Sequence, residues 1–557
     1  MRAPPRPGAM RYSSPMADPI GRRDFLRSGA IGGTALFVNP RSARTSDVLP
    51  GAAGEITRFE LDEVTIADLQ DRMQKGQSSA VAITQAYLDR IAALDLKGPI
   101  LRSVLETNPE ALDDAKALDA ERKAGKVRGP LHGIPVLLKD NINTAGRMKT
   151  TAGSLALDEA PVPPDAFIAA RLRNAGVVIL GKTNLSEWAN FRSTRSTSGW
   201  SGRGGQCRNP YALDRNTSGS SSGTGAAIAA NLAAVGVGTE TDGSIVSPAN
   251  NCGLVGVKPT LGLVSRAGII PIAHSQDTAG PMARTVRDAA ILLTALAGVD
   301  ATDAATAKSA RYATRDYTQF LDPAGLKGAR IGIPRKKLFG YSSGADRVGA
   351  EAIAALKDAG AVIIDPADVP FIDKFGDPEF EVLLYEFKAD LNAYLSSRKG
   401  RVASLTDLIA YNTEHKEREL PFFGQEILEM AQKKGPLTDP KYRQARAACV
   451  RYARTLGIDA IMTRHRLDAL VCPTSGPATL IDLINGDYGS GSSSSGPAVA
   501  GYPHITVPGG YVFGLPVGMS FIGRAWSEPT LFKLAYAFEQ ATKQRKAPTF
   551  AATADLA

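Results

Sequence analysis

Two separate segments of the chain hold residues that are suited to attack a carbonyl group without the help of a histidine. Lys139 ends an apolar run that begins at Gly133 (GIPVLLK). A lysine at the end of a buried strand is desolvated, which lowers its pKa and leaves a neutral amine that can act as a base. Residues 218–260 are rich in small residues and contain two Gly-Ser turns, at Gly219 and Gly243. Small residues let backbone amides approach a substrate carbonyl closely.

A phosphate-binding loop is a competing interpretation of residues 176–183. The sequence GVVILGKT fits the pattern GxxxxGK[ST]. A loop that wraps phosphates needs loop-forming residues in its middle, but Val-Val-Ile-Leu has the composition of a strand. The preceding residues 171–175 are typical of a helix end. We therefore disfavour nucleotide binding and expect Lys182 to have a structural role.

A serine-hydrolase elbow is a second competing interpretation, because residues 219–223 (GSSSG) fit the pattern GxSxG. In that arrangement the serine follows a strand and works with an acid and a histidine later in the chain. Residues 214–218 are instead polar and turn-like, although His465 or His504 could formally serve as the histidine. A serine-rich loop matches this pattern easily by chance, so we disfavour an elbow at Ser221.

The elements that must position these residues alternate along the chain in an α/β order. Short apolar runs predict buried strands, and the stretches between them predict helices, so we expect layers around a largely buried sheet. Residues 62–96 are expected to be helical, with a capping box at Thr65 and Asp68. The predicted strands are 134–138, 177–180, 331–333, 361–364, 470–472, 505–507 and 517–521, and the other predicted helices are 164–175, 284–297, 346–359 and 528–544.

Length and composition favour one large globular domain over residues 55–557. The chain has 557 residues, of which 43% are hydrophobic and 22% charged, and this composition excludes disordered and collagen-like classes. No repeat or convincing linker divides it, although residues 380–456 are charged and helical and are expected to form an insertion. Residues 486–496 predict a flexible loop. No apolar run reaches the roughly 18 residues of a membrane span, so we expect no stable membrane anchor.

The charged residues and the cysteines exclude further classes of partner. Residues 1–50 contain eight arginines and three aspartates, which account for +5 of the net charge of +9. The +4 that is left is too dispersed to predict nucleic-acid binding. The four cysteines are widely spaced and form no zinc-ligand pattern, so no metal site is expected, and a disulfide stays possible with no pairing favoured.

The first 45 residues have the features of an export signal and leader. Arg22 and Arg23 are followed by Phe25-Leu26 and by a short, weakly apolar and glycine-rich run at 28–38. This pattern is typical of a twin-arginine signal. We expect an exported, periplasmic protein, or a cytoplasmic one if the leader does not function. The cleavage site and the true start are not fixed by the sequence.

Taken together, Lys139, Gly219-Ser220-Ser221 and Gly243-Ser244-Ile245 resemble the amidase signature family. The 24-residue separation of the two serines suits the family, and the resemblance runs through most of residues 60–545. It implies a large mixed, twisted β-sheet core flanked by helices on both faces, with a signature core at about 120–300. Several stretches are more similar still to the peptide amidase subgroup: LSEWANFR (185–192), TETDGSIVSPA (239–249), QDTAGPMART (276–285), LLYEFKADL (383–391) and GRAWSEPTLF (523–532).

The chain departs from the commonest family pattern at two positions. Asp242 stands where glycine is usual, and Val246 stands where arginine often follows Gly-Ser-Ile. The peptide amidase subgroup is similar at both positions, so we interpret them as marks of that subgroup. They weaken any transfer of substrate preference from amidases that carry the arginine.

The resemblance implies a Ser-Ser-Lys triad. Ser244 would attack the amide carbonyl, Ser220 would take its proton, and neutral Lys139 would take the proton of Ser220. In the family the bridging serine follows a cis peptide bond, which here would be Gly219–Ser220. No metal or cofactor is required by this chemistry.

The resemblance also implies where the oxyanion binds and what is hydrolysed. Backbone N–H groups around Thr241, Asp242, Gly243 and Ser244 would form the oxyanion hole. The expected substrates are linear carboxamides, foremost the C-terminal amide of peptides, with release of ammonia. Alternatives are a broad aliphatic or aryl amidase or esterase and, from another class, an inactive amide-binding protein on the same fold. A component of a tRNA-dependent amidotransferase is less expected, because an exported protein would not meet charged tRNA.

Overall fold

The computed structural model of the chain describes residues 59–556. These residues all belong to one compact unit. The predicted leader, residues 1–45, lies outside the described residues. None of the helices in the described part combines the length and the apolar character that a membrane crossing requires.

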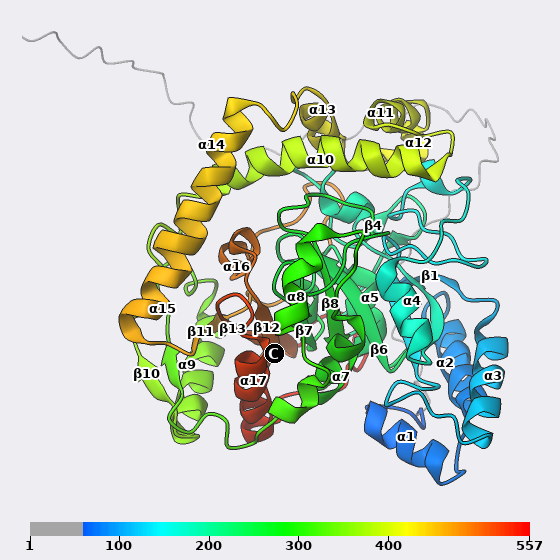
Figure 1. The fold of residues 1–557 in the computed structure, drawn as a ribbon, viewed down its shortest axis with the longest axis horizontal. Helices are drawn as coiled ribbons and strands as arrows, with labels where there is room; N and C mark the ends of the chain where they lie inside the picture. The colour runs from blue at the N-terminus through cyan, green and yellow to red at the C-terminus, as the bar shows by residue number, and fades with distance from the viewer. Residues whose placement is uncertain (1–58, 557) are drawn as a thin grey trace, which may run out of the picture. The chain divides into compact units, whose positions relative to one another are not determined.

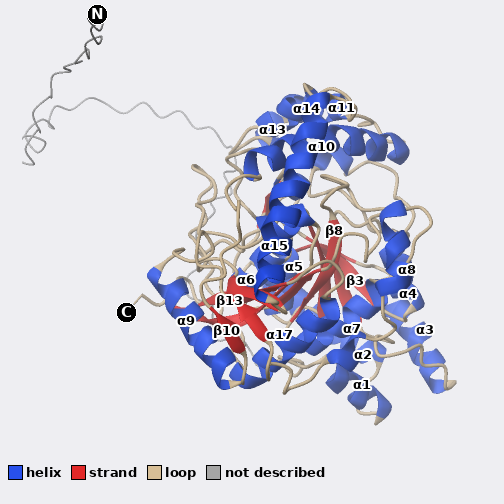
Figure 2. Cartoon of the chain, turned by 60° about the vertical axis from the view of Figure 1, so that its left-hand side comes forward, coloured by secondary structure: helices blue, strands red, loops and turns tan. Residues whose placement is uncertain are grey.

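An eleven-stranded mixed sheet forms the centre of the unit, as the sequence predicted, and helices flank it (Figure 2). Its spatial order is β1-β3-β2-β6-β8-β7-β12-β13-β11-β9-β10. β2 is parallel to β3 and β6, β9 is parallel to β10 and β11, and the other neighbours are antiparallel. The strands are β1 Val104–Thr107, β2 Pro135–Lys139, β3 Val178–Thr183, β6 Val235–Glu240, β7 Val255–Lys258, β8 Thr278–Ala283, β9 Arg330–Gly332, β10 Val362–Ile364, β11 Ala469–Pro473, β12 His504–Val512 and β13 Leu515–Ile522. A separate two-stranded ribbon pairs β4 Trp200–Ser201 with β5 Gly205–Gln206.

All seven predicted strands are present, but β1, β6, β7 and β8 were not predicted. β6 reads VGVGTE, β7 reads VGVK and β8 reads TAGPMA, so glycine, alanine and polar residues interrupt the apolar run that marks a buried strand. The small residues suit crowded positions, because a Cβ on Gly280 would collide with the backbone oxygen of Val257. Tertiary packing therefore overrides weak strand propensity here.

Helices are present in every segment where the sequence predicted them, with ends that differ by a few residues, and further helices such as α3, α6 and α16 were not predicted. The capping box of the first helix is confirmed, because the Thr65 side chain accepts from the Asp68 N–H and the Asp68 side chain accepts from the Thr65 N–H. The helices are α1 Ile66–Gln74, α2 Ala80–Leu94, α3 Ala111–Lys123, α4 Phe167–Asn174, α5 Ser222–Ala229, α6 Val246–Asn251, α7 Val286–Leu296, α8 Ser309–Tyr312, α9 Ser343–Asp358, α10 Gly376–Arg398, α11 Leu405–Glu414, α12 Lys416–Glu419, α13 Glu426–Gln432, α14 Pro440–Cys449, α15 Asp459–His465, α16 Ser495–Ala500 and α17 Glu528–Thr542.

Helices α10 to α14 form the segment that the sequence analysis described as an insertion, and α10 runs along the top of the view in Figure 1. α10 packs against α11, α13 and α14. Its apolar residues also share one buried cluster with two loops of the sheet region. That cluster includes Leu384, Phe387 and Leu391 of α10 together with Trp188, Phe191, Ile270 and Ile272. The insertion is therefore packed directly against the loops at the C-terminal end of the central strands.

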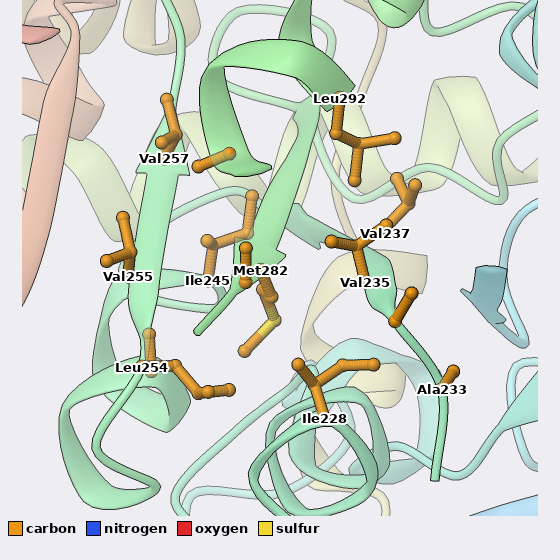
Figure 3. Close-up of a cluster of buried hydrophobic side chains, with 14 of the residues drawn as sticks. Ile228, Ala233, Val235, Val237, Ile245, Leu254, Val255, Val257, Met282 and Leu292 are labelled. Atoms are coloured by element: carbon orange, nitrogen blue, oxygen red, sulfur yellow. The ribbon is translucent and has the colours of Figure 1, made fainter. Parts of the chain in front are cut away.

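The core beneath this end of the sheet joins β6, β7 and β8 to the helices around them (Figure 3). Val235 and Val237 of β6 and Met282 of β8 are fully buried with Ile228 of α5. Ile245, which follows Ser244 directly, is buried in the same cluster. The turn that carries Ser244 is thus anchored in the main core.

Candidate active site

Lys139 ends β2 and is fully buried. Its ammonium nitrogen donates to Ser220 Oγ at 2.7 Å, to Thr239 Oγ1 at 2.9 Å and to the Thr239 carbonyl oxygen at 3.2 Å. Burial lowers the pKa of Lys139 from its ordinary value to about 7, although the charges of Glu240 and Asp277 oppose this shift. A substantial neutral fraction at neutral pH makes this amine able to accept a proton.

Ser220 lies in the loop that leads into α5, and its side chain faces Lys139. The Gly219–Ser220 peptide bond is cis, as the family resemblance implied. The neighbouring Ser221 hydroxyl donates to the Thr239 carbonyl at 3.1 Å and accepts from the Thr239 N–H at 3.2 Å. Thr239 therefore fastens both the lysine and the serine loop to the end of β6.

Ser244 lies in the turn between β6 and α6 and is only 7% exposed. The Ser221 N–H donates to the Ser244 carbonyl oxygen at 3.1 Å, so the two serine-bearing loops are joined next to both serines. Among the hydrogen bonds of residues 59–556, none links the hydroxyls of Ser220 and Ser244 directly. The structure therefore brings Lys139 and Ser220 into contact and places Ser244 on the adjoining loop.

The turn before Ser244 has backbone N–H groups that are available to a ligand. Within the described residues, the N–H groups of Asp242, Gly243 and Ser244 donate to no protein acceptor. Gly243 has a φ of 81°, a conformation that favours glycine. The Glu240 carboxylate accepts from the N–H groups of Ile245 and Val246 at 2.8 and 3.0 Å. Glu240 thereby holds the first residues of α6 and leaves the preceding N–H groups for a ligand.

The side chain of Asp242 has contacts that the sequence did not predict. Its carboxylate accepts from the hydroxyls of Ser494 at 2.5 Å and Ser495 at 2.6 Å. Burial and the adjacent Asp242 carboxylate raise the pKa of Glu379, on α10, well above its ordinary value. The hydrogen bonds from Ser494 and Ser495 attach the end of the loop 486–496, which was predicted to be flexible, to the turn before Ser244.

A short loop, residues 272–277, connects that turn to the insertion. The Asp277 carboxylate accepts from the Thr241 hydroxyl at 2.6 Å, and burial raises the pKa of Asp277 to about 6. The Gln276 amide donates to the Thr241 carbonyl at 3.3 Å and to Glu379 at 2.8 Å. The Ser275 N–H donates to Glu386 of α10 at 2.9 Å. Sequence reasoning missed these residues, although QDTAG is part of the stretches that carry the resemblance.

The competing motifs do not assemble other sites. Residues 178–183 form a buried strand rather than a loop, and the Lys182 ammonium donates to the carbonyl oxygens of Ile142 and Lys149. The Ser221 hydroxyl hydrogen-bonds to Thr239 in the described structure, with no histidine involved. The four cysteines are free and buried within the described residues. Lys182 therefore has the structural role that the sequence predicted.

Comparisons with known proteins show that the sequence and the fold are similar to those of amidases. The sequence model of the family described as Amidase matches residues 82–532. The solved native peptide amidase from Stenotrophomonas maltophilia superposes with a TM-score of 0.86 at 54% identity, over 88% of this chain and 100% of that one.

Curated relatives extend the comparison to a plant and to another activity. The probable amidase At4g34880 of Arabidopsis thaliana is 42% identical over 515 residues, which cover 90% of this chain and 95% of the relative. A component of the glutamyl-tRNA(Gln) amidotransferase of Caldanaerobacter subterraneus subsp. tengcongensis is 36% identical over 497 residues, which cover 87% of this chain and 98% of the relative. The likeness therefore spans nearly the whole described part of the chain.

Proposed function

The chain belongs to the amidase family and is an amidohydrolase, and from this premise we propose that it hydrolyses the C-terminal carboxamide of peptides. The products would be a peptide with a free carboxylate and ammonia. The observation that carries the proposed chemistry is the 2.7 Å bond from a fully buried Lys139 to Ser220 Oγ, beside the loop of Ser244. The choice of peptide amides follows the likeness to the solved peptide amidase.

In the proposed mechanism Ser244 Oγ attacks the carbonyl carbon of the amide. Its proton passes to Ser220, whose own proton passes to neutral Lys139. The negative oxygen of the tetrahedral intermediate is stabilised by the N–H groups of residues 241–244. Removal of one such donor typically raises the barrier by about 3–4 kcal/mol.

The same relay then runs in reverse. Ser220 donates a proton to the departing nitrogen, and the C–N bond breaks. Ammonia departs, and the acyl group stays bound to Ser244 as an ester. Water attacks the ester carbonyl while Ser220 and Lys139 again take its proton. The bond between the acyl carbon and Ser244 Oγ then breaks, Ser244 recovers a proton through the same relay, and the product leaves as a carboxylate after losing its acid proton to water. In the proposed relay, protons pass between the side chains of Ser244, Ser220 and Lys139, and the backbone N–H groups stabilise the oxyanion.

The experiment measures the release of ammonia from a short C-terminally amidated peptide, an amino-acid amide, an aromatic amide and free glutamine, and the release of alcohol from an ester analogue. Preferred turnover of the peptide amide supports the proposal. Preferred turnover of the simple amides or of the ester assigns the broader amidase or esterase activity, and preferred turnover of glutamine assigns a glutaminase instead. Absence of turnover on the whole panel favours an inactive amide-binding protein.

We also propose that the chain is exported through its leader. The twin arginines Arg22 and Arg23 and the short apolar run that follows support this. The test is fractionation of cells that produce the full chain or the variant with both arginines replaced by lysine. Export predicts a periplasmic protein that stays in the cytoplasm in the variant, and equal distribution of both would contradict export.

A further inference from the structure

A cavity of about 420 Å³ lies beside the candidate active site, between the end of β6 and the insertion helix α10. Its buried end is lined by Asn141, Thr239 and Thr241. Thr239 and Thr241 are the residues that hold Lys139 and the turn before Ser244, respectively, to their neighbours. Apolar residues 269–272 line the same cavity. The cavity therefore adjoins both halves of the proposed catalytic machinery.

Two buried oxygens at this cavity lack a hydrogen-bond donor. Within the described residues, neither Asn141 Oδ1 nor Glu240 Oε1 has a partner, and both residues line the cavity while being at most 2% exposed. The Asn141 amide nitrogen is already engaged, because it donates to Thr239 Oγ1 at 2.9 Å. Buried acceptors without a donor are unfavourable, so a ligand that brings N–H groups to this end of the cavity would be favoured there.

The more exposed end of the cavity also offers an acceptor. Asp390 of α10 uses Oδ2 to accept from the backbone N–H of His274 at 3.0 Å and from its Nδ1 at 2.8 Å. Its Oδ1 receives no hydrogen bond from residues 59–556, and the side chain is 23% exposed. The second oxygen of this carboxylate is therefore accessible to a ligand.

The charge of the lining is negative on balance. The carboxyl groups are those of Glu240, Asp277, Asp303 and Asp390, against the two basic side chains of Arg266 and His274. The Arg266 guanidinium is already paired with Asp303, and the His274 ring with Asp390. A lining of acceptors and negative charge is complementary to a cation and repels an anion.

We propose that this cavity is a subsite for a primary ammonium group on the acyl side of the amide substrate. An ammonium has three donors and no acceptor, and the methylene groups that carry it would pack on the apolar wall formed by residues 269–272. The ammonium could belong to a lysine side chain or to the free N-terminus of a short peptide. This inference rests on the proposed function, because it names the class of peptide amides that the same site prefers.

The test compares matched peptide amides that carry lysine, norleucine or glutamate at one position, each with a free or an acetylated N-terminus. kcat/KM is measured by ammonia release for the wild type, Asp390→Asn and Asp377→Asn. Asp377 is an exposed acid on α10 that does not line the cavity, so its variant makes the same change of charge elsewhere on the helix.

We expect the wild type to prefer the lysine peptide over the norleucine peptide by about fivefold and to turn over the glutamate peptide most slowly. Asp390→Asn should remove most of this preference and leave the norleucine peptide unchanged, whereas Asp377→Asn should keep it. The N-terminus is identified as the source of the ammonium if acetylation lowers kcat/KM of the norleucine peptide. Raising the salt concentration should weaken the preference in the wild type without any substitution.

Equal kcat/KM for all six peptides, with no effect of the side chain or of acetylation, would overturn the subsite. So would an Asp390→Asn variant that loses the same factor on every peptide, because that pattern indicates a structural role. Failure to hydrolyse any peptide amide is a different outcome, since it contradicts the proposed function on which the subsite rests.

Discussion

Lys139 and Lys182 lie on adjacent parallel strands, and Leu138, the neighbour of Lys139 on β2, pairs with Lys182 on β3. Both lysines are fully buried. Lys182 lies 3.5 Å from a carboxylate oxygen of Asp140 and also donates to Thr150 Oγ1 and two carbonyl oxygens. Burial lowers its pKa to about 8, and the charge of Asp140 limits the shift.

The Lys139 ammonium contacts a hydroxyl group, Ser220 Oγ, whereas the Lys182 ammonium lies next to a carboxylate, that of Asp140. Within residues 59–556 no carboxylate lies within 4 Å of the Lys139 ammonium, and its pKa falls to about 7. In the proposed mechanism, burial alone does not make a base. A buried lysine with a counterion ties strands together, whereas a buried lysine without one can exchange a proton with the hydroxyl it touches.

The first prediction is that the two lysines differ in their importance for turnover. Lys139→Met should lower kcat by about a thousandfold or more, because the relay loses its final proton acceptor. Lys182→Met should retain most of kcat per folded molecule. The measurement is kcat on protein whose fold is verified by circular dichroism, and similar losses in the two variants would contradict the assignment.

Stability should respond in the opposite sense. Lys182→Met leaves the buried Asp140 without one of its cations, although Arg203 stays 3.6 Å away. We expect a loss of about 3 kcal/mol in the free energy of unfolding, since an unpaired buried charge is strongly unfavourable. Lys139→Met removes no ion pair within 4 Å and should cost less. Denaturant unfolding of both variants measures this difference.

The pH dependence of turnover should also depend on Lys139 and not on Lys182. Because the pKa of Lys139 is about 7, the lysine is protonated and inactive as a base at lower pH. We expect kcat/KM to rise about tenfold per pH unit below pH 7 and to level off above it. Lys182→Met serves as the control and should leave this acid limb in place. A wild-type profile that is flat between pH 5 and about 8 would contradict a lysine base.

The smallest effect concerns the residue that supports Lys139. Thr239→Val keeps the shape of the side chain but removes the hydroxyl that accepts from Lys139 and from Asn141. We expect kcat to fall by about tenfold with little change in KM, because the lysine is held less well. Thr183→Val is a matched control, since its hydroxyl contacts Thr224 outside the site. An equal loss in the control would indicate a general effect on packing.

Much of the sheet could be predicted from the sequence, because β2, β3, β9, β10, β11, β12 and β13 contain short apolar runs. The central strands β6 and β8 could not, since glycine and threonine replace the apolar residues there. Those replacements belong to the site. Gly238 lies against Ser221, and Thr239 holds Lys139, so the strand signal is weak where function uses the strand.

The candidate site divides in the same way. Lys139, Ser220 and Ser244 could be proposed because their motifs are local and resemble a known family. Gln276, Asp277 and Asp390 could not, because their contacts join segments that are far apart in the sequence. Glu379 and Asp390 lie on a charged helix, where sequence gives no means to tell a residue facing the site from a solvated one.

The central claim is that Ser244 is a nucleophile activated through Ser220 by Lys139. The most direct test is the rate of covalent labelling by a fluorophosphonate, with the labelled residue identified by mass spectrometry, in the wild type and in Lys139→Met across pH 5 to about 9. We predict that the rate of labelling at Ser244 increases as the pH rises through about 7 and is nearly lost in Lys139→Met. Labelling at another residue, or equal rates at Ser244 in both proteins, would contradict it.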